Sequence, residues 1–197
     1  MTLSSIIGKY DRKLKKYYKE QMEYEVTDPA AVWICDNYHI CSAGLTAAKS
    51  FVSHNGEKGL LPLFLSCKKL AENTVQVTAS GIINAFSDKK LSVFQSEALK
   101  PLLFSAFAAE CCDRAINGEL TEAAVRNLIG LREIDFSYIR ERVCMAEKYL
   151  LDDPTGEYGK CDEKTKKLYR DAVMRGAKKR EKGRNSIHKR KAECGTK

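Results

Sequence analysis

The carboxylates most able to do chemistry lie in one short stretch near the end of the chain, LLDDPTGEYGKCDEKT, at residues 150–165. A calcium loop that began at the first of its paired aspartates would need oxygen ligands at positions three and five, and glycine at position six. Those positions hold Pro154, Gly156 and Glu157, so the spacing excludes such a loop. Proline and glycine instead predict a turn, and Asp162 is placed to cap the helix that follows. The sequence therefore predicts a structural joint here rather than a reactive site.

No other residues form a catalytic, metal-binding or cofactor-binding pattern. The three histidines, His39, His54 and His188, lie far apart, and none has a partner at ligand spacing. The eight cysteines include no C-x-x-C pair, which predicts reduced thiols of a cytoplasmic protein. Phosphate-binding glycine loops and nucleophile elbows are also missing from the sequence. We therefore expect no catalytic residue, no cofactor, no metal and no small-molecule ligand.

Positive charge is concentrated at the end of the chain. Residues 164–197 contain 14 Lys and Arg against 3 Asp and Glu, whereas residues 1–163 contain 20 against 23. Such a basic segment could bind nucleic acid in a salt-dependent way, or lie against an anionic membrane surface. Because it contains few aromatic residues and follows no base-reading motif, a solvated helix face is the simpler interpretation. The chain has neither a run of about 20 apolar residues nor a secretory leader, so we expect no membrane span.

Apolar residues recur every three or four positions over most of the chain, which predicts helices, and strand-like alternation is hard to find. We expect an all-α fold: a multi-helix bundle of about seven or eight helices with short connections and a basic C-terminal helix or tail. We divide the chain into an N-terminal amphipathic helix (1–27), a helical bundle domain (28–180) and a basic tail or linker (181–197). The expected helices cover residues 3–24, 28–51, 60–73, 77–86, 92–117, 120–131 and 135–150, with a last helix from 162.

Some residues within these helices have an expected role of their own. Asp28 before Pro29 is a helix start, and Thr121 and Asp135 are placed to cap the helices that follow them. The Asp36-Asn37 pair (36–37) lies on an otherwise apolar face, so we expect it to hydrogen-bond the backbone of a neighbouring helix. Residues 99–107 belong to the longest apolar stripe, which could dock a partner helix.

Four stretches of the chain match one family pattern. The most specific is 152–173, DDPTGEYGKCDEKTKKLYRDAV, and weaker matches lie at 32–40 (VWICDNYHI), 91–107 (LSVFQSEALKPLLFSAF) and 131–136 (LREIDF). Together these stretches resemble the amino-terminal helical region of cyclic β-1,2-glucan synthases, which are large bacterial proteins. The residues that carry the resemblance are Trp33, Asp36, Asn37, Glu97, Asp135, Asp153, Pro154, Gly156, Tyr158, Asp162, Tyr169 and Arg170.

The resemblance implies a function that the residues alone do not. Members of that family join a glycosyltransferase, a glucoamylase-like module and a glycoside phosphorylase-like module in one membrane-associated chain, and nothing in this sequence matches their catalytic residues. The resemblance therefore implies a non-catalytic helical accessory domain in the cytoplasm, at the inner face of the cell membrane, whose partners are other modules of the parent polypeptide. The residues leave two alternatives open: a free-standing basic helical nucleic-acid-binding protein and a helical protein-interaction module.

Overall fold

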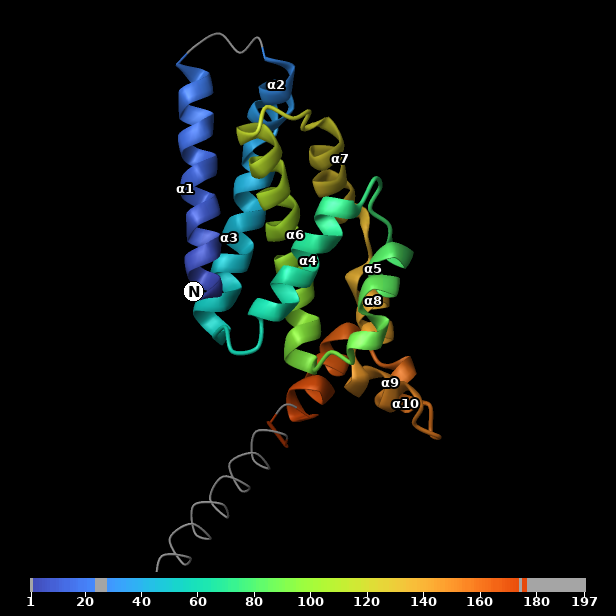
Figure 1. Cartoon of the computed structure of the whole chain (residues 1–197). Coiled ribbons are helices and arrows are strands. Elements are labelled where there is room, and N and C mark those ends of the chain that lie inside the picture. The colour runs from blue at the N-terminus through green and yellow to red at the C-terminus, as the bar shows by residue number, and fades with distance from the viewer. Residues whose placement is uncertain (1, 24–27, 174, 177–197) are drawn as a thin grey trace, which may run out of the picture.

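The computed structural model describes residues 2–23, 28–173 and 175–176, which fold as helices with short connections (Figure 1). The α-helices with defined bounds are α1 (Leu3–Met22), α2 (Pro29–Asp36), α3 (Tyr38–Asn55), α4 (Leu61–Asn73), α5 (Ala79–Phe86), α6 (Val93–Ile116), α7 (Glu122–Gly130), α8 (Phe136–Val143), α9 (Met145–Leu151) and α10 (Glu157–Lys160). Two short 3-10 helices, η1 (Ser87–Lys89) and η2 (Leu131–Glu133), lie between them, and a further helix follows α10 over 163–173. The all-α prediction is confirmed, but the expected count of seven or eight helices was too low. The predicted tail, 181–197, lies outside the described residues.

The count rises partly because two expected helices are each divided at a single residue. Asn37 (φ −111°, ψ 20°) separates α2 from α3, and Cys144 (φ −86°, ψ 122°) separates α8 from α9. At the second break the Leu91 N–H donates to the Val143 carbonyl at 3.2 Å, and the Met145 N–H donates to the Leu91 carbonyl at 3.0 Å. The backbone of a distant segment therefore replaces hydrogen bonds that a continuous helix would have made.

Helix α6 runs through the centre of the bundle, with α3 and α4 packed along it (Figure 1). It begins at a capping box, in which Ser92 accepts from the Gln95 N–H and the Gln95 side chain accepts from the Ser92 N–H. Its apolar stripe over 99–107 is buried in the core at Leu99, Leu102, Leu103, Ala106 and Phe107. The prediction that this stripe docks a partner helix is therefore wrong, because helices of the same chain already cover it.

Gly44 lets α3 approach α6 closely. A Cβ atom built at Gly44 would lie 2.9 Å from the carbonyl oxygen of Phe104, nearer than a real Cβ comes to backbone. Any larger residue at this position would push the two helices apart, so the bare backbone of glycine is required for the contact. Gly44 thus sets how closely α3 approaches α6 at this point.

Helix α1 packs on α3 and α6 and shares their core. Leu3, Ile6, Ile7 and Leu14 on one face of α1 are buried, while Lys and Arg cover much of the rest. The first turn of α1 is tied to the loop after α3, since the Ser4 N–H and hydroxyl both donate to Glu57 Oε2, at 2.9 and 3.0 Å. The amphipathic helix predicted at the start of the chain therefore contributes directly to the apolar core that the other helices build.

Three of the four predicted helix caps, those of Asp28, Asp135 and Asp162, are present, and the one by Thr121 is not. The side chains of Asp28 and Asp135 accept hydrogen bonds from backbone N–H groups two residues ahead, at 2.9 and 2.8 Å. Thr121 is fully buried, and its hydroxyl donates to the carbonyl oxygen of Ala30 at 2.8 Å, instead of capping α7. Its predicted role as a cap was wrong because a contact 91 positions away along the chain takes the hydroxyl.

Candidate functional site

The acidic stretch after α9 closes a turn. The Asp153 carboxylate accepts hydrogen bonds from the hydroxyl and the N–H of Thr155, and Gly156 has the positive φ of 63° that ends the turn. Asp152, Asp153 and Pro154 are exposed. The hydrogen bonds that Asp153 accepts within this turn come from Thr155. The sequence of this stretch thus directs the chain from α9 into α10.

The residues that follow this turn converge on Glu147 in α9. Tyr158, in α10, donates from its hydroxyl to Glu147 Oε1 at 2.7 Å, and Arg170, in the helix 163–173, donates to the same oxygen at 3.5 Å. All three side chains are buried, with only 1% of Glu147, 2% of Arg170 and 3% of Tyr158 exposed. We call residues 136–173 the C-terminal corner, and this cluster is its centre.

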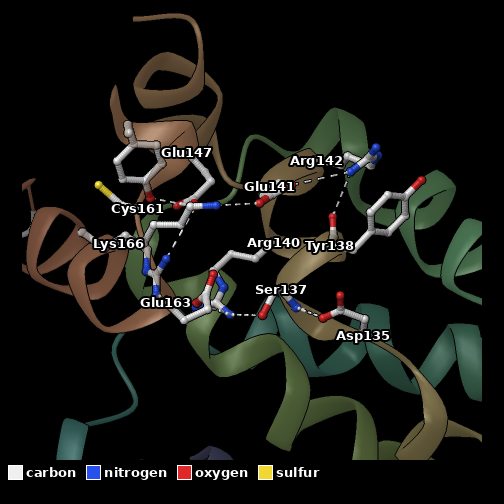
Figure 2. Close-up of polar contacts among 12 residues, drawn as sticks. Asp135, Ser137, Tyr138, Arg140, Glu141, Arg142, Glu147, Cys161, Glu163 and Lys166 are labelled. Atoms are coloured by element: carbon white, nitrogen blue, oxygen red, sulfur yellow. Dashed lines mark hydrogen bonds and ion pairs between the residues drawn. The ribbon is translucent and has the colours of Figure 1, made fainter. Parts of the chain in front are cut away.

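A second layer of ion pairs surrounds the cluster, as Figure 2 shows. Glu163 lies 3.3 Å from Arg170 and 3.8 Å from Arg140 of α8. Lys166 reaches across to Glu141 of α8, with 3.2 Å between its Nζ and the carboxylate Oε1. The Glu163–Arg140 and Lys166–Glu141 pairs connect the helix 163–173 to α8, and Arg170 connects it to Glu147 of α9.

The surroundings of the cluster favour a neutral tyrosine and a charged arginine. Burial raises the pKa of Tyr158, and its hydrogen bond to the Glu147 carboxylate raises it further. Burial by itself would lower the pKa of Arg170, but the Glu147 carboxylate and Tyr158 outweigh that effect, so the pKa is raised. The guanidinium therefore stays charged, and the phenol stays protonated, over any ordinary range of pH.

Two buried atoms of the cluster are left without a hydrogen-bond partner among the described residues: Glu147 Oε2 and Arg170 Nε. An unsatisfied buried polar atom costs roughly 1–3 kcal/mol, so this arrangement stabilises the fold less than a fully hydrogen-bonded one would. A buried ion pair often stabilises less than apolar packing would, while breaking it on one side is costly. What the cluster supplies is a defined geometry between α9, α10 and the helix 163–173.

Other residues of the predicted set hold local structure. Trp33 lies in α2 beneath the Arg126 guanidinium, which is 4.7 Å from its ring centroid. Asp36 is exposed, and the Asn37 side-chain amide donates to the Trp33 carbonyl of its own helix at 2.9 Å. The expectation that this pair binds the backbone of a neighbouring helix was therefore wrong. Asp162 accepts from the Thr165 N–H at 2.7 Å, a bond that lowers the pKa of its carboxyl.

Glu97 and Tyr169 lie at the edges of the cluster. Glu97 is half-buried on α6, where burial and the negative charge of Asp171 raise the pKa of its carboxyl against the opposing effect of Arg170. Tyr169 meets the ring of Tyr158 edge to face, with 5.5 Å between centroids. The structure thus brings the C-terminal members of the predicted set together and leaves Trp33, Asn37 and their neighbours elsewhere in the fold.

Sequence reasoning missed the residue on which the cluster depends. Glu147 follows Ile139 and Val143 at intervals of four, so it stands on the buried face of the helix that was expected from Asp135. A carboxylate on an apolar face predicts a buried cationic partner, and this signal was available in the sequence. The sequence did not indicate which cation would reach this carboxylate, because Arg170 lies 23 positions further along the chain.

Neither the arrangement of metal-binding side chains among the described residues nor the comparison with known proteins indicates an activity. Among the residues that the structure describes, no three His, Cys, Asp or Glu side chains are grouped so that they could hold a metal ion. Over the same residues, no helix has the length and apolar character needed to cross a membrane. Comparison of the chain with protein-family models, curated proteins and solved structures finds no match.

Proposed function

We propose that this chain is a non-catalytic helical accessory domain of a cyclic β-1,2-glucan-synthase-like protein. The proposal begins from the resemblance of residues 152–173 to that family, in which a tyrosine and an arginine stand at the positions of Tyr158 and Arg170. One observation carries it: these two residues meet at the buried Glu147 carboxylate. Because Tyr158 and Arg170 are enclosed in packing, a structural role accounts for these two residues without a substrate.

The way the corner is built also supports an accessory role. Three of its ionic contacts, Lys166–Glu141, Arg170–Glu147 and Arg140–Glu163, join the helix 163–173 to α8 or α9, and we infer that they fix the direction in which this helix leaves the bundle. In a longer polypeptide, a helix held at a defined angle would transmit the position of the bundle to the module that follows. The partners of the domain are then other modules of the parent polypeptide, and its place is the cytoplasmic side of the membrane.

An enzyme assay tests the first part of this proposal. The purified chain is incubated with UDP-glucose, and separately with β-1,2-glucan chains, and the products are analysed by chromatography. We expect no transfer of glucose and no cleavage or phosphorolysis of the glucan. Reproducible turnover that is lost in a heat-unfolded sample would reject a non-catalytic role.

The coding sequence that lies beyond Lys197 tests the parentage. We expect it to continue in frame into membrane spans and a glycosyltransferase module. A stop codon at that point in the natural gene, with no such module encoded nearby, would contradict the proposal while leaving the assay result intact.

A salt titration separates this proposal from nucleic-acid binding. Most of the basic segment lies beyond the described residues, and within them Lys166 is already paired with Glu141. We expect binding of duplex DNA or RNA only at low salt, where any basic segment binds. Sequence-dependent binding that persists at physiological salt would favour the free-standing nucleic-acid-binding protein instead.

A further inference from the structure

A cavity of about 600 Å³ opens between α3 and α6, and Arg132 of η2 also lines it. Its volume lies in the range of small-molecule sites, which are mostly apolar with a few polar groups that face inward. The lining residues are His39, Ile40, Ala43, Gly44, Ala47, Lys100, Pro101, Phe104 and Arg132.

The apolar part of the cavity is shaped by the close approach of α3 to α6. Ala43 and Ala47 stand one helical turn apart on α3, and their small side chains leave room above the contact made by Gly44. Phe104 forms the opposite wall and packs against Phe136, with 6.3 Å between ring centroids. The close approach of α3 to α6 at Gly44 forms the floor of the cavity.

The charged part of the cavity has a single sign. His39, Lys100 and Arg132 are the ionisable residues of its lining, and no carboxylate lies among them. Some cations elsewhere in the described chain have acidic partners, as Lys68 does with Glu110 at 3.1 Å. Within the described residues, no ion pair or side-chain hydrogen bond engages these three basic side chains; Lys100 only faces the Phe136 ring, 5.4 Å from its centroid.

We propose that this cavity binds a small organic anion, with an acidic group held by Lys100 and Arg132 and an apolar body lying on Ala43, Ala47 and Phe104. The two cations and the His39 ring would supply donors to a carboxylate, sulfonate or phosphate ester. The apolar surface would favour a ligand that is more than a simple ion, since burying it releases water. The inference does not rest on the proposed function, and it differs from the expectation of no small-molecule ligand drawn from the sequence.

A wider groove beside α9 is the weaker candidate. It has a volume of about 910 Å³ and exposes Met145, Tyr149 and Val173, but its lining mixes Glu57 with lysines. Charges of both signs therefore line this groove, and its carboxylate, Glu57, already accepts two hydrogen bonds from Ser4. The smaller cavity combines an apolar wall with a lining that contains Lys100 and Arg132 and no carboxylate.

Two naphthalene probes of nearly the same shape test the proposal. The sulfonate 8-anilinonaphthalene-1-sulfonate carries the anionic group, whereas N-phenyl-1-naphthylamine lacks it, and both fluoresce when they enter an apolar site. Each is titrated into the full-length protein, and near-UV circular dichroism verifies that every variant retains its tertiary packing. We expect the wild type to bind one equivalent of the sulfonate saturably, and the neutral probe more weakly.

Three variants locate the site. Lys100→Ala with Arg132→Ala should weaken sulfonate binding by about tenfold or more and leave the neutral probe within about twofold. Lys49→Ala with Lys69→Ala removes the same charge from exposed positions outside the cavity, and should change neither affinity. Ala43→Trp fills the cavity without altering charge and should abolish the binding of both probes.

The proposal fails on any of three results. An equal loss of sulfonate binding in the Lys100→Ala, Arg132→Ala variant and in the Lys49→Ala, Lys69→Ala variant would show that net charge alone attracts the probe. Unchanged binding in Ala43→Trp would place the probe elsewhere. A folded wild-type protein that binds neither probe would show that the cavity accepts no ligand of this class.

Discussion

The core around α6 and the C-terminal corner hold helices together by different means. Between α3, α4 and α6 the buried side chains are nearly all apolar, and the Lys68–Glu110 pair lies toward the edge of that packing. In the corner the central contact is a carboxylate with a tyrosine and an arginine, and ion pairs surround it. Figure 1 shows the two regions at different levels of the molecule, with α9 and α10 beyond the end of the bundle.

This difference indicates which region stabilises the fold and which region sets the orientation of the helix 163–173. Apolar burial contributes roughly 25 cal/mol per Å² and depends little on orientation, so it favours many packings of similar shape. A buried ion pair gains little net free energy but tolerates few geometries, since each misplaced charge is costly. We therefore infer that the core around α6 keeps the chain folded, and that the corner fixes where the helix 163–173 points. Substitutions at four positions, Phe107, Arg170, Tyr158 and Tyr10, test this comparison.

The largest loss of stability is expected from Phe107→Ala. Phe107 is 1% exposed at the centre of α6, and removing a buried ring typically costs about 3–5 kcal/mol of unfolding free energy. Urea denaturation followed by circular dichroism measures the change. Leu65→Ala is the matched control, because Leu65 is 55% exposed on α4 and should cost about 0.5 kcal/mol or less. Equal losses in the two variants would contradict the assignment of the core.

Arg170→Met should cost about 3 kcal/mol, because it leaves the Glu147 carboxylate buried without its cation. Adding Glu147→Gln removes that charge, so the double variant should recover part of the loss. Lys167→Met, on the exposed side of the same helix, is the control for the loss of a positive charge. A loss in the double variant equal to the sum of the losses in Arg170→Met and Glu147→Gln would show that the two residues are not coupled.

The comparison makes a further prediction for hydrogen exchange in these variants. Arg170→Met should increase exchange of backbone amides in 157–173 more than in α3, because the corner can open without unfolding the core. Uniform loss of protection along the chain would show instead that the two regions unfold as one unit.

Tyr158→Phe should have the smallest effect, about 1 kcal/mol at neutral pH, through loss of one buried hydrogen bond to Glu147. The folded protein raises the pKa of Tyr158, so at alkaline pH the unfolded chain releases a proton that the folded chain retains. Wild-type stability is then complete below about pH 10 and falls as the pH rises above it. The phenylalanine variant lacks this contribution, so its unfolding free energy should fall less between about pH 9 and about pH 11.

Tyr10 supplies the matching measurement in the core around α6. Its hydroxyl donates to Asp113 at 2.8 Å, and burial together with this bond raises its pKa to about 12. Tyr10→Phe should therefore also reduce the alkaline loss of stability, and the effects of the two substitutions should add because they lie in separate regions. An alkaline loss that is identical in the wild type and both variants would contradict the burial of the two phenols.

Short-range sequence signals determined most of the helices. The periodicity of apolar residues located α4, α5 and α6 to within two residues, and the aspartates at 28 and 135 marked helix starts correctly. Proline and glycine located the turn before α10. These features depend on a residue and its neighbours within about one helical turn, so the sequence alone carries them.

Long-range contacts decided the rest. The break at Cys144 is made by the backbone of Leu91, and Thr121 is drawn from its expected cap by Ala30. Glu147 acquires its role only when Tyr158 and Arg170 arrive from two later helices, and the rim of the cavity joins three separate segments of the chain. Periodicity states which face of a helix is buried but not what will lie against it, because that choice is made by packing across the whole fold.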